Sequence, residues 1–363
     1  MFAPTRYLDW ARRYYGKVRF DLATSGMPAI PLTDLGVPTA DRFDDPSGWQ
    51  RLRGAIAAYN EVQPDESVAT LGTSHGLWLG YASMTVPGDD VLVEDPAYEP
   101  LVRIAEGCGA RVVRFAREAR NGFALDPDRI ARALTPRTRV VAVTNLHNPS
   151  GVRTPDDVLG AIARMLEPRG AHLLVDEVYA PFDALVDARG VFTGSARKVA
   201  SNVIAVSSLT KCYGLAAERI GWLLGPREIV ARAEDAMRAC CGMLPLSHAH
   251  VALEAFARIG FLADRARATL SGKRARVKAW VESHASSGFV WSAPTAGLFA
   301  LVTLADAGDL TPTIEAAARD HEVLVAAGAF FGVPNGFRVA WSAPSDVLDE
   351  GLARLEAALG CGR

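Results

Sequence analysis

The sequence predicts an α/β fold: a large domain with a mostly parallel central sheet flanked by helices, joined to a smaller α+β domain. From residue 48 to about 240, short apolar segments alternate with amphipathic helical ones, a pattern typical of βαβ units. After about residue 245 the pattern changes to long helical stretches, then apolar strands and a last helix. The chain of 363 residues is also longer than one typical domain.

Residues 1–40 contain closely spaced Pro and Gly, as in SGMPAIP and GVPT, so we expect an irregular arm with short elements. Amphipathic helices are expected at GWQRLRGAIAAYN, GLWLGYASMTV, DPDRIARAL and PDDVLGAIARML. Short apolar runs predict buried strands at DDVLVED, ARVVRFA, TRVVAVTNL, AHLLVDEVY, NVIAVSSL and RIGWLLG.

The C-terminal part begins with the helical pattern SHAHVALEAFARIGFLADRARATL. It continues with the strands GLFALVTL and GFRVAWS and ends with the amphipathic helix DVLDEGLARLEAAL. These changes predict a large domain at residues 40–250 and a small domain formed by residues 1–39 and 251–363.

The composition is that of a soluble globular protein, with 49% hydrophobic and 22% charged residues. A net charge of −2 gives no reason to expect nucleic acid or an acidic membrane as a partner. The N-terminus lacks the apolar core of a secretion signal, and no apolar run approaches the roughly 18 residues that span a bilayer. Five cysteines without a CxxC pair indicate neither zinc nor a disulfide framework, so a reducing cytoplasm fits best.

The segment SSLTKCYGLAAERIGW lies between two predicted strands, where ligands bind in open α/β sheets. Lys211 is one of only five lysines, and Arg cannot replace Lys where a deprotonated, nucleophilic amine is needed. A desolvated Lys211 flanked by positive charge would have a lowered pKa and form an imine readily. Ser208 and Arg219 could hold a phosphate. The alternative is a surface lysine beside a helix cap.

Two further motifs place polar groups at strand ends. VTNLHNPSG puts Asn148 at a sheet edge, although Asn before Pro is also common in ordinary turns. LLVDEVYAPF puts Asp176 inside an apolar strand, where a carboxylate needs a partner such as a pyridinium N–H or an Arg. Tyr179 could donate to a neighbouring oxygen or simply be a half-buried tyrosine.

Three other segments give weaker signals. Thr73 and Ser74 precede a helical pattern, which suits either an anion site or a plain N-cap. Tyr98 follows a strand and could stack on a flat heterocycle or pack in the core. Arg338 alternates with apolar residues in GFRVAWS, so it could bind a substrate carboxylate or face outward from the strand.

Together, SSLTKCYGLAAERIGW, NLHNPSG and VDEVYAPF resemble the class I/II aminotransferases of pyridoxal 5′-phosphate (PLP) fold type I, the aspartate-aminotransferase fold. The order and separations are similar, and the resemblance covers nearly the whole chain. It implies that Lys211 forms the Schiff base with PLP and that Asp176 pairs with the pyridine nitrogen. It also implies the remaining contacts: Tyr179 and Asn148 to the 3′ oxygen, Tyr98 stacked on the ring, Thr73, Ser74, Ser208 and Arg219 at the phosphate, Arg338 on the substrate α-carboxylate, and the backbone of Gly26 beside it.

The chain departs from the family pattern in two places. Many relatives carry a tyrosine, five residues before the glycine that opens the first long helix, that reaches the phosphate of the neighbouring subunit; here the position is Phe43. One phosphate contact of the dimer-shared site would then be lost. His75 and Trp78 are also unexpected after the phosphate loop, and they either line the site or pack beneath it.

The implied reaction is transamination by a ping-pong mechanism, with Lys211, Asp176 and Tyr179 as catalytic residues and a homodimer as the assembly. Other PLP reactions on the same scaffold are elimination, decarboxylation and cyclisation. The N-terminal LDWARRYYGKVRFDLATSGM is also similar to capreomycidine synthase-like members, which cyclise arginine-derived amino acids. We favour transamination because Asp176 and Tyr179 of the DEVY motif are intact. A non-enzymatic PLP-binding protein would sooner have lost Lys211 or Asp176.

Overall fold

The computed structural model describes residues 3–36, 47–183 and 186–361. Its largest sheet has seven strands in the order β2-β8-β7-β6-β5-β3-β4. The strands are β2 (Ser67–Leu71), β3 (Asp90–Asp95), β4 (Arg111–Ala116), β5 (Thr138–Thr144), β6 (His172–Asp176), β7 (Val203–Ser208) and β8 (Ile220–Leu224). Strands β3 to β7 pair in parallel, whereas β8 runs antiparallel to both β7 and β2. The predicted, mostly parallel central sheet is therefore confirmed.

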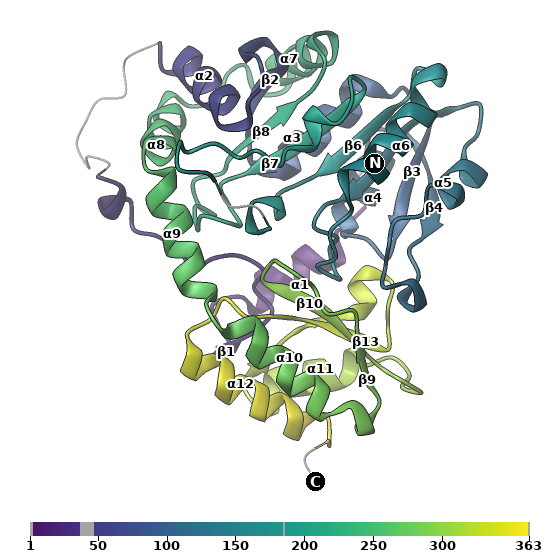
Figure 1. Ribbon diagram of the computed structural model, residues 1–363, viewed down its shortest axis with the longest axis vertical. Coiled ribbons are helices and arrows are strands. Elements are labelled where there is room, and N and C mark those ends of the chain that lie inside the picture. The colour runs from purple at the N-terminus through teal and green to yellow at the C-terminus, as the bar shows by residue number, and fades with distance from the viewer. Residues whose placement is uncertain (1–2, 37–46, 184–185, 362–363) are drawn as a thin grey trace.

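Helices cover both faces of this sheet, as Figure 1 shows. Side chains of neighbouring strand positions point to opposite faces: Val141 and Val143 belong to one apolar cluster, Val140 and Ala142 to another. This is the reason that the strands read as continuous apolar runs. The helices of this part are α2 (Gly48–Asn60), α3 (Gly72–Met84), α4 (Glu99–Gly107), α5 (Pro127–Ala133), α6 (Asp156–Leu166), α7 (Arg227–Cys241) and α8 (Leu246–Ala257).

A second, antiparallel sheet has the order β12-β13-β10-β9 and lies at the lower end of Figure 1. Its strands are β9 (Phe289–Trp291), β10 (Phe299–Leu304), β12 (Ala326–Ala327) and β13 (Gly336–Ala340). Around it lie α10 (Lys273–Ser283), α11 (Thr311–Asp320) and α12 (Ser345–Ala358), while α9 (Ile259–Leu270) connects α8 of the large part to α10. The N-terminal segment joins this part, because β1 (Phe20–Asp21) pairs in parallel with β11 (Val323–Leu324). The exact domain boundaries at residues 39/40 and 250/251 stay predictions.

Eight short 3₁₀ helices occupy connections between these elements in the described chain. They are η1 (Leu32–Leu35), η2 (Pro64–Glu66), η3 (Ala119–Asn121), η4 (Glu167–Arg169), η5 (Ala180–Phe182), η6 (Ala196–Lys198), η7 (Ala285–Ser287) and η8 (Gly328–Phe331). No helix within the described ranges is long and apolar enough to cross a membrane.

The N-terminal arm differs from its prediction, because residues Arg6–Tyr14 form the helix α1. Tyr7, Trp10 and Ala11 are buried on one face, at the i, i+3, i+4 spacing of a helix. The single helical pattern predicted from residue 247 onward is also divided, since Arg258 leaves helical dihedral angles between α8 and α9. Of these differences, α1 matters for the site.

Candidate active site

The carboxyl edge of the seven-stranded sheet brings the predicted site residues together. Asp176 and Ser208 are the last residues of β6 and β7. Strand β8 runs in the opposite direction, so the residue before it, Arg219, reaches the same edge from its other end. The first turn of α3, directly after β2, adds Thr73 and Ser74, and the segments after β3 and β5 add Tyr98 and Asn148.

A cavity of about 250 Å³ lies at this edge. Nine of its lining residues are those predicted to hold the cofactor: Thr73, Ser74, Tyr98, Asn148, Asp176, Tyr179, Ser208, Lys211 and Arg219. Leu8, Val178 and Thr210 line it as well. Leu8 belongs to α1, and the sequence analysis did not predict that this segment contributes to the site.

Lys211 is buried and lies near two cationic groups. Burial lowers the pKa of its amine, and the positive charges of Arg338 and Arg219 also lower it. The backbone of the 25–27 segment packs against it: the Met27 N–H donates to the Lys211 carbonyl oxygen at 2.9 Å. A Cβ on Gly26 would lie 3.6 Å from Lys211 Cδ. The lysine is thus held at the cavity with an amine that loses its proton more readily than that of a free lysine, and it is not a surface lysine at a helix cap.

Asp176 is a buried carboxylate that forms no ion pair among the described residues, although the nearby charge of Lys211 acts to lower its pKa. Its Oδ1 accepts the N–H of Val178 at 3.2 Å. Burial raises the pKa of Asp176 to about 7. The alternative of an Asp–Arg salt bridge is therefore not realised within the described chain. A protonated ring nitrogen facing Asp176 would supply the missing positive partner.

The residues predicted for the phosphate form a cradle of hydrogen-bond donors. Thr73 Oγ1 donates to Ser208 Oγ at 3.0 Å, and Ser208 Oγ accepts the N–H of Thr210 at 3.4 Å. Arg219 is exposed, and its guanidinium donates to two backbone carbonyls, those of Leu71 at 3.4 Å and Ala216 at 3.2 Å. Hydroxyls, an arginine and the N-terminus of α3 make an anion site of the kind that binds phosphate.

Arg338 lies on β13 of the small sheet and is completely buried, so the outward-facing alternative is wrong. Its Nη1 donates to Asn148 Oδ1 at 2.7 Å, which joins the two parts of the molecule. Its Nη2 donates to Tyr7 Oη at 2.7 Å and to the Ala23 carbonyl oxygen at 3.3 Å. Within the described chain its Nε–H has no acceptor. A carboxylate beside it would satisfy both the charge and this donor.

The sequence of this chain also matches the model of a known protein family. The model of the class I and II aminotransferases matches residues 28–355. The chain belongs to this family. Capreomycidine synthase from Streptomyces vinaceus is 32% identical, with 97% of this chain and 92% of that protein covered. An arginine–pyruvate transaminase from Pseudomonas aeruginosa is 30% identical, with 53% of this chain and 50% of that protein covered.

Solved structures confirm the predicted aspartate-aminotransferase fold. Aspartate aminotransferase from Thermus thermophilus has a TM-score of 0.81 at 22% identity, covering 97% of this chain and 94% of that one. The PLP-dependent cyclase OrfR has a TM-score of 0.85 at 25% identity, covering 99% of this chain and 97% of that one. Members of the family and fold are PLP-dependent, so the cofactor prediction is also confirmed.

The residues present fit PLP. The unpaired, buried carboxylate of Asp176 suits the pyridine nitrogen, and the cradle at Thr73, Ser208 and Arg219 suits the phosphate. Lys211 supplies the amine between them. When bound, PLP supplies an electron sink for the breaking of bonds at an amino acid's Cα.

Tyr98 and Tyr179 both line the cavity as neutral phenols, because burial raises the pKa of each. The Tyr179 hydroxyl lies 2.9 Å from Ser25 Oγ and 3.2 Å from the Ser25 carbonyl oxygen. The Tyr98 ring meets the ring of Tyr7 edge-on, with centroids 6.1 Å apart. Their predicted roles, at the 3′ oxygen and on the ring face, stay predictions.

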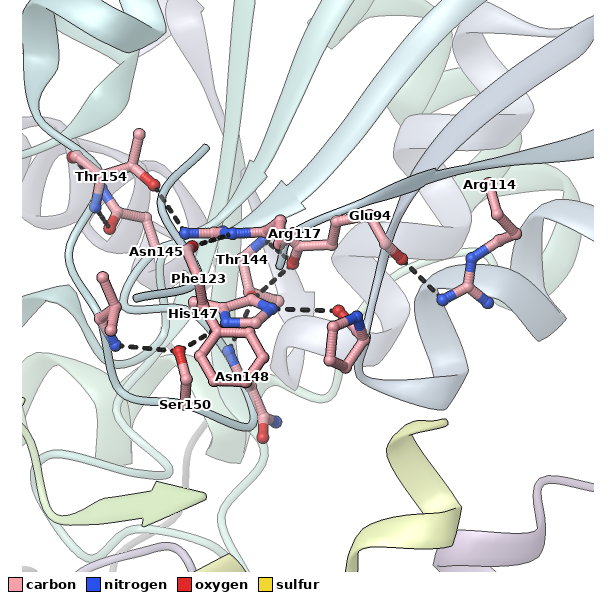
Figure 2. Close-up of polar contacts among 12 residues, drawn as sticks. Glu94, Arg114, Arg117, Phe123, Thr144, Asn145, His147, Asn148, Ser150 and Thr154 are labelled. Carbon is pink, nitrogen blue, oxygen red and sulfur yellow. Dashed lines mark hydrogen bonds and ion pairs between the residues drawn. The ribbon is translucent and has the colours of Figure 1, made fainter. Parts of the chain in front are cut away.

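A buried network holds Asn148 in place, and the sequence analysis missed it (Figure 2). Glu94 pairs with Arg117 at 2.8 Å and accepts both the backbone and hydroxyl hydrogens of Thr144. Thr144 Oγ1 in turn accepts the N–H of Asn148 at 2.8 Å. Glu94 lies in the apolar strand DVLVED, so the reasoning applied to Asp176 would have marked it as a buried carboxylate that needs a partner.

Two unexpected residues do not line the cavity. His75 stacks on Trp78 with ring centroids 6.2 Å apart, and Trp78 packs against the apolar cluster below. One ligand atom each of His75, Cys240 and Cys241 lies within 4.8 Å of the others. However, His75 Nδ1 accepts the N–H of Leu71 at 3.1 Å, which puts the proton of a neutral ring on Nε2 and leaves no lone pair for a metal. Phe43 lies outside the described residues.

Gly72 permits the close approach of Arg219, and we expect Gly72→Ala to weaken PLP binding. Its φ is +76°, and a Cβ there would lie 2.9 Å from Arg219 Cζ. The variant must shift Arg219 and strain the loop, so the dissociation constant for PLP should rise about tenfold, the effect of losing one charge-assisted hydrogen bond. Fluorescence titration of the cofactor-free protein measures this. Gly54→Ala is the control, because nothing lies within 4 Å of a Cβ at Gly54; equal affinities in the two variants would contradict the expectation.

Proposed function

We propose that the protein is an aminotransferase that moves the α-amino group of an amino acid to a 2-oxo acid. The reaction is balanced without an external oxidant, because the donor becomes a 2-oxo acid and the acceptor becomes an amino acid. The observation that carries this proposal is one cavity lined by a lysine of lowered pKa and a buried carboxylate, with a buried arginine hydrogen-bonded to Asn148 of its lining. These are Lys211, Asp176 and Arg338.

Each residue would have one task. Arg338 binds the α-carboxylate and thereby fixes which bond of Cα faces the cofactor. Asp176 keeps the ring nitrogen protonated. The amine of Lys211 accepts the Cα proton, a role for which its lowered pKa is suited, since a base works best when its pKa is near the working pH. Asn148 and Tyr179 orient the ring, while Thr73, Ser74, Ser208 and Arg219 hold the phosphate.

A second function, cyclisation of an arginine-derived amino acid, is supported by different observations. The similarity to capreomycidine synthase extends over 97% of this chain, and the cyclase OrfR has the same fold. A cyclase would convert one substrate into a ring product and would need no 2-oxo acid. The two functions therefore differ in stoichiometry.

Single-turnover measurements test the proposal. For an aminotransferase, mixing the PLP-loaded protein with its amino acid should abolish the visible absorbance of the bound cofactor and release one equivalent of 2-oxo acid. Adding a second 2-oxo acid should restore the absorbance, and initial-rate plots for the two substrates should be parallel, as for ping-pong kinetics. Intersecting lines would contradict transamination, and a cyclic product formed without oxo acid would favour the second function.

We further propose that the protein is a cytoplasmic homodimer. The five cysteines, all unpaired, suit a reducing compartment. Arg219 and the neighbouring Leu71 are exposed at the phosphate end of the cavity, where a second subunit would cover them. Sedimentation of the purified protein measures the oligomeric state.

A further inference from the structure

Helix α1 lies between the large and small parts of the molecule and contacts both (Figure 1). The N–H of Tyr7 donates to Glu99 Oε2 at 2.9 Å, on α4 of the large part. Its hydroxyl accepts from Arg338 Nη2 at 2.7 Å, on β13 of the small part. Tyr7 is 5% exposed, so it is a core residue of the site that the sequence analysis did not identify.

The hydrogen bonds around Tyr7 have a defined direction. The Tyr15 hydroxyl donates its single proton to the Ala23 carbonyl oxygen at 3.1 Å. In the 2.8 Å contact between the two hydroxyls, Tyr7 must therefore be the donor and Tyr15 the acceptor. Since its own proton is used in this way, the oxygen of Tyr7 faces Arg338 as a pure acceptor.

Tyr7 and Asn148 hold the guanidinium of Arg338 from its two ends. Asn148 accepts from Nη1, and Tyr7 together with Ala23 takes Nη2. Three aromatic rings surround the group, with Cζ at 5.4 Å from the ring centroid of Tyr7, 5.0 Å from Phe299 and 4.9 Å from Phe331. Its hydrogen-bond acceptors are an amide oxygen, a phenol oxygen and a backbone carbonyl oxygen, and no carboxylate of the described chain pairs with it. The position of this cation, and hence of the anion it binds, depends on these few contacts.

We propose that Tyr7 is a positioning residue that sets Arg338 for the substrate α-carboxylate, which makes α1 a part of the substrate site. The proposal rests on the proposed function insofar as Arg338 binds that carboxylate. It predicts a specific loss when the Tyr7 oxygen is removed: weaker binding of molecules that carry the carboxylate, with PLP binding unchanged.

Tyr7→Phe tests this, because it keeps the ring contacts with Trp10, Tyr98, Phe330 and Phe331 and removes only the oxygen. In the PLP-loaded protein we expect the KM for the amino acid to rise about tenfold, as for loss of a hydrogen bond to a charged group, with kcat changed less than twofold. Tyr15→Phe should act in the same direction but more weakly, since it removes the acceptor of the Tyr7 proton and the donor to the Ala23 carbonyl oxygen but leaves the Tyr7 oxygen in place. Tyr14→Phe, on the same helix and in ring contact with Trp10, should behave as wild type.

Three further readouts separate positioning from a merely structural role. The dissociation constant for PLP should be equal in wild type and Tyr7→Phe, and so should affinity for the primary amine that lacks the carboxylate. The dissociation constant of the α-amino acid, read from the absorbance change of the bound cofactor, should rise about tenfold. The role of Tyr7 would be overturned if Tyr7→Phe had the wild-type dissociation constant for the amino acid, or if its affinities for the amino acid and the amine fell equally. This binding measurement can be made even if the protein forms no 2-oxo acid. The absence of a 2-oxo acid would overturn the proposed function but not the role of Tyr7.

Discussion

Lys211→Ala should abolish turnover and the visible absorbance band of the lysine-linked cofactor. The side chain is the only amine among the residues that line the described cavity, and its pKa is lowered by burial and by two neighbouring cations. Removing a general base typically costs 10² to 10⁴-fold, and loss of the covalent link adds to this, so we expect a rate lower by about 10⁴-fold. Absorbance spectroscopy and single-turnover assays measure the two effects.

Lys198→Ala provides the matched control for this variant. Lys198 lies near the surface, and its Nζ pairs with Glu61 at 2.8 Å, away from the cavity. Its removal should leave both the absorbance band and turnover unchanged. The Lys211→Ala protein should still bind PLP through the phosphate cradle, because Thr73, Ser208 and Arg219 are intact. A variant that retained the band and its activity would show that another group holds the cofactor.

The part of the site at the sheet edge could be predicted from sequence because each group follows a recognisable strand. Asp176, Ser208 and Lys211 lie at or just after the ends of apolar runs, and the carboxyl ends of parallel strands meet at one edge. Once the order of the strands is known, local sequence therefore places these residues within a few ångströms of each other. The pattern of alternating strands and helices predicted their common edge, and the resemblance to the aminotransferase motifs predicted their roles.

The other half of the site depends on contacts between distant parts of the chain. Tyr7 and Arg338 are 331 positions apart, and Arg338 and Asn148 are 190 apart. No periodicity in the sequence connects α1 with β13. A buried Arg338 and an outward-facing Arg338 therefore give the same sequence pattern. The Pro and Gly residues after α1 also made the N-terminus read as an irregular arm, although aromatic residues give α1 a buried face.

Asp176→Asn should have opposite effects on the cofactor-free and the PLP-bound protein. In the cofactor-free protein, burial raises the pKa of Asp176 from its ordinary 3.8 to about 7. The folded state therefore holds this proton more tightly than the unfolded chain. The cost of ionising the buried group is absent below pH 3.8, grows as the pH rises toward 7 and is complete above it. The difference between the two pKa values corresponds to about 4 kcal/mol.

Asparagine keeps the oxygen that accepts from Val178 but carries no charge, so this cost disappears. The cofactor-free variant should have a higher unfolding temperature than wild type at pH 8, and the difference should shrink as the pH falls toward 4. Glu177 is also buried with its pKa raised to about 7, so wild type and variant share its contribution and the comparison isolates Asp176. Calorimetry at several pH values measures the difference; one that stayed constant with pH would contradict the burial of an unpaired carboxylate.

With PLP bound, the same substitution should be harmful. The ring nitrogen loses its counter-charge, and breaking a buried charge pair costs about 3–5 kcal/mol, or roughly 10²- to 10⁴-fold in rate. Glu177→Gln is the control, because Glu177 bonds to Ser195 Oγ and the Ala196 N–H instead of lining the cavity, so affinity for PLP should be unaffected. If the variant is more stable without PLP yet far less active with it, then Asp176 serves the bound cofactor and destabilises the cofactor-free fold. Full activity of Asp176→Asn would remove the carboxylate from the mechanism.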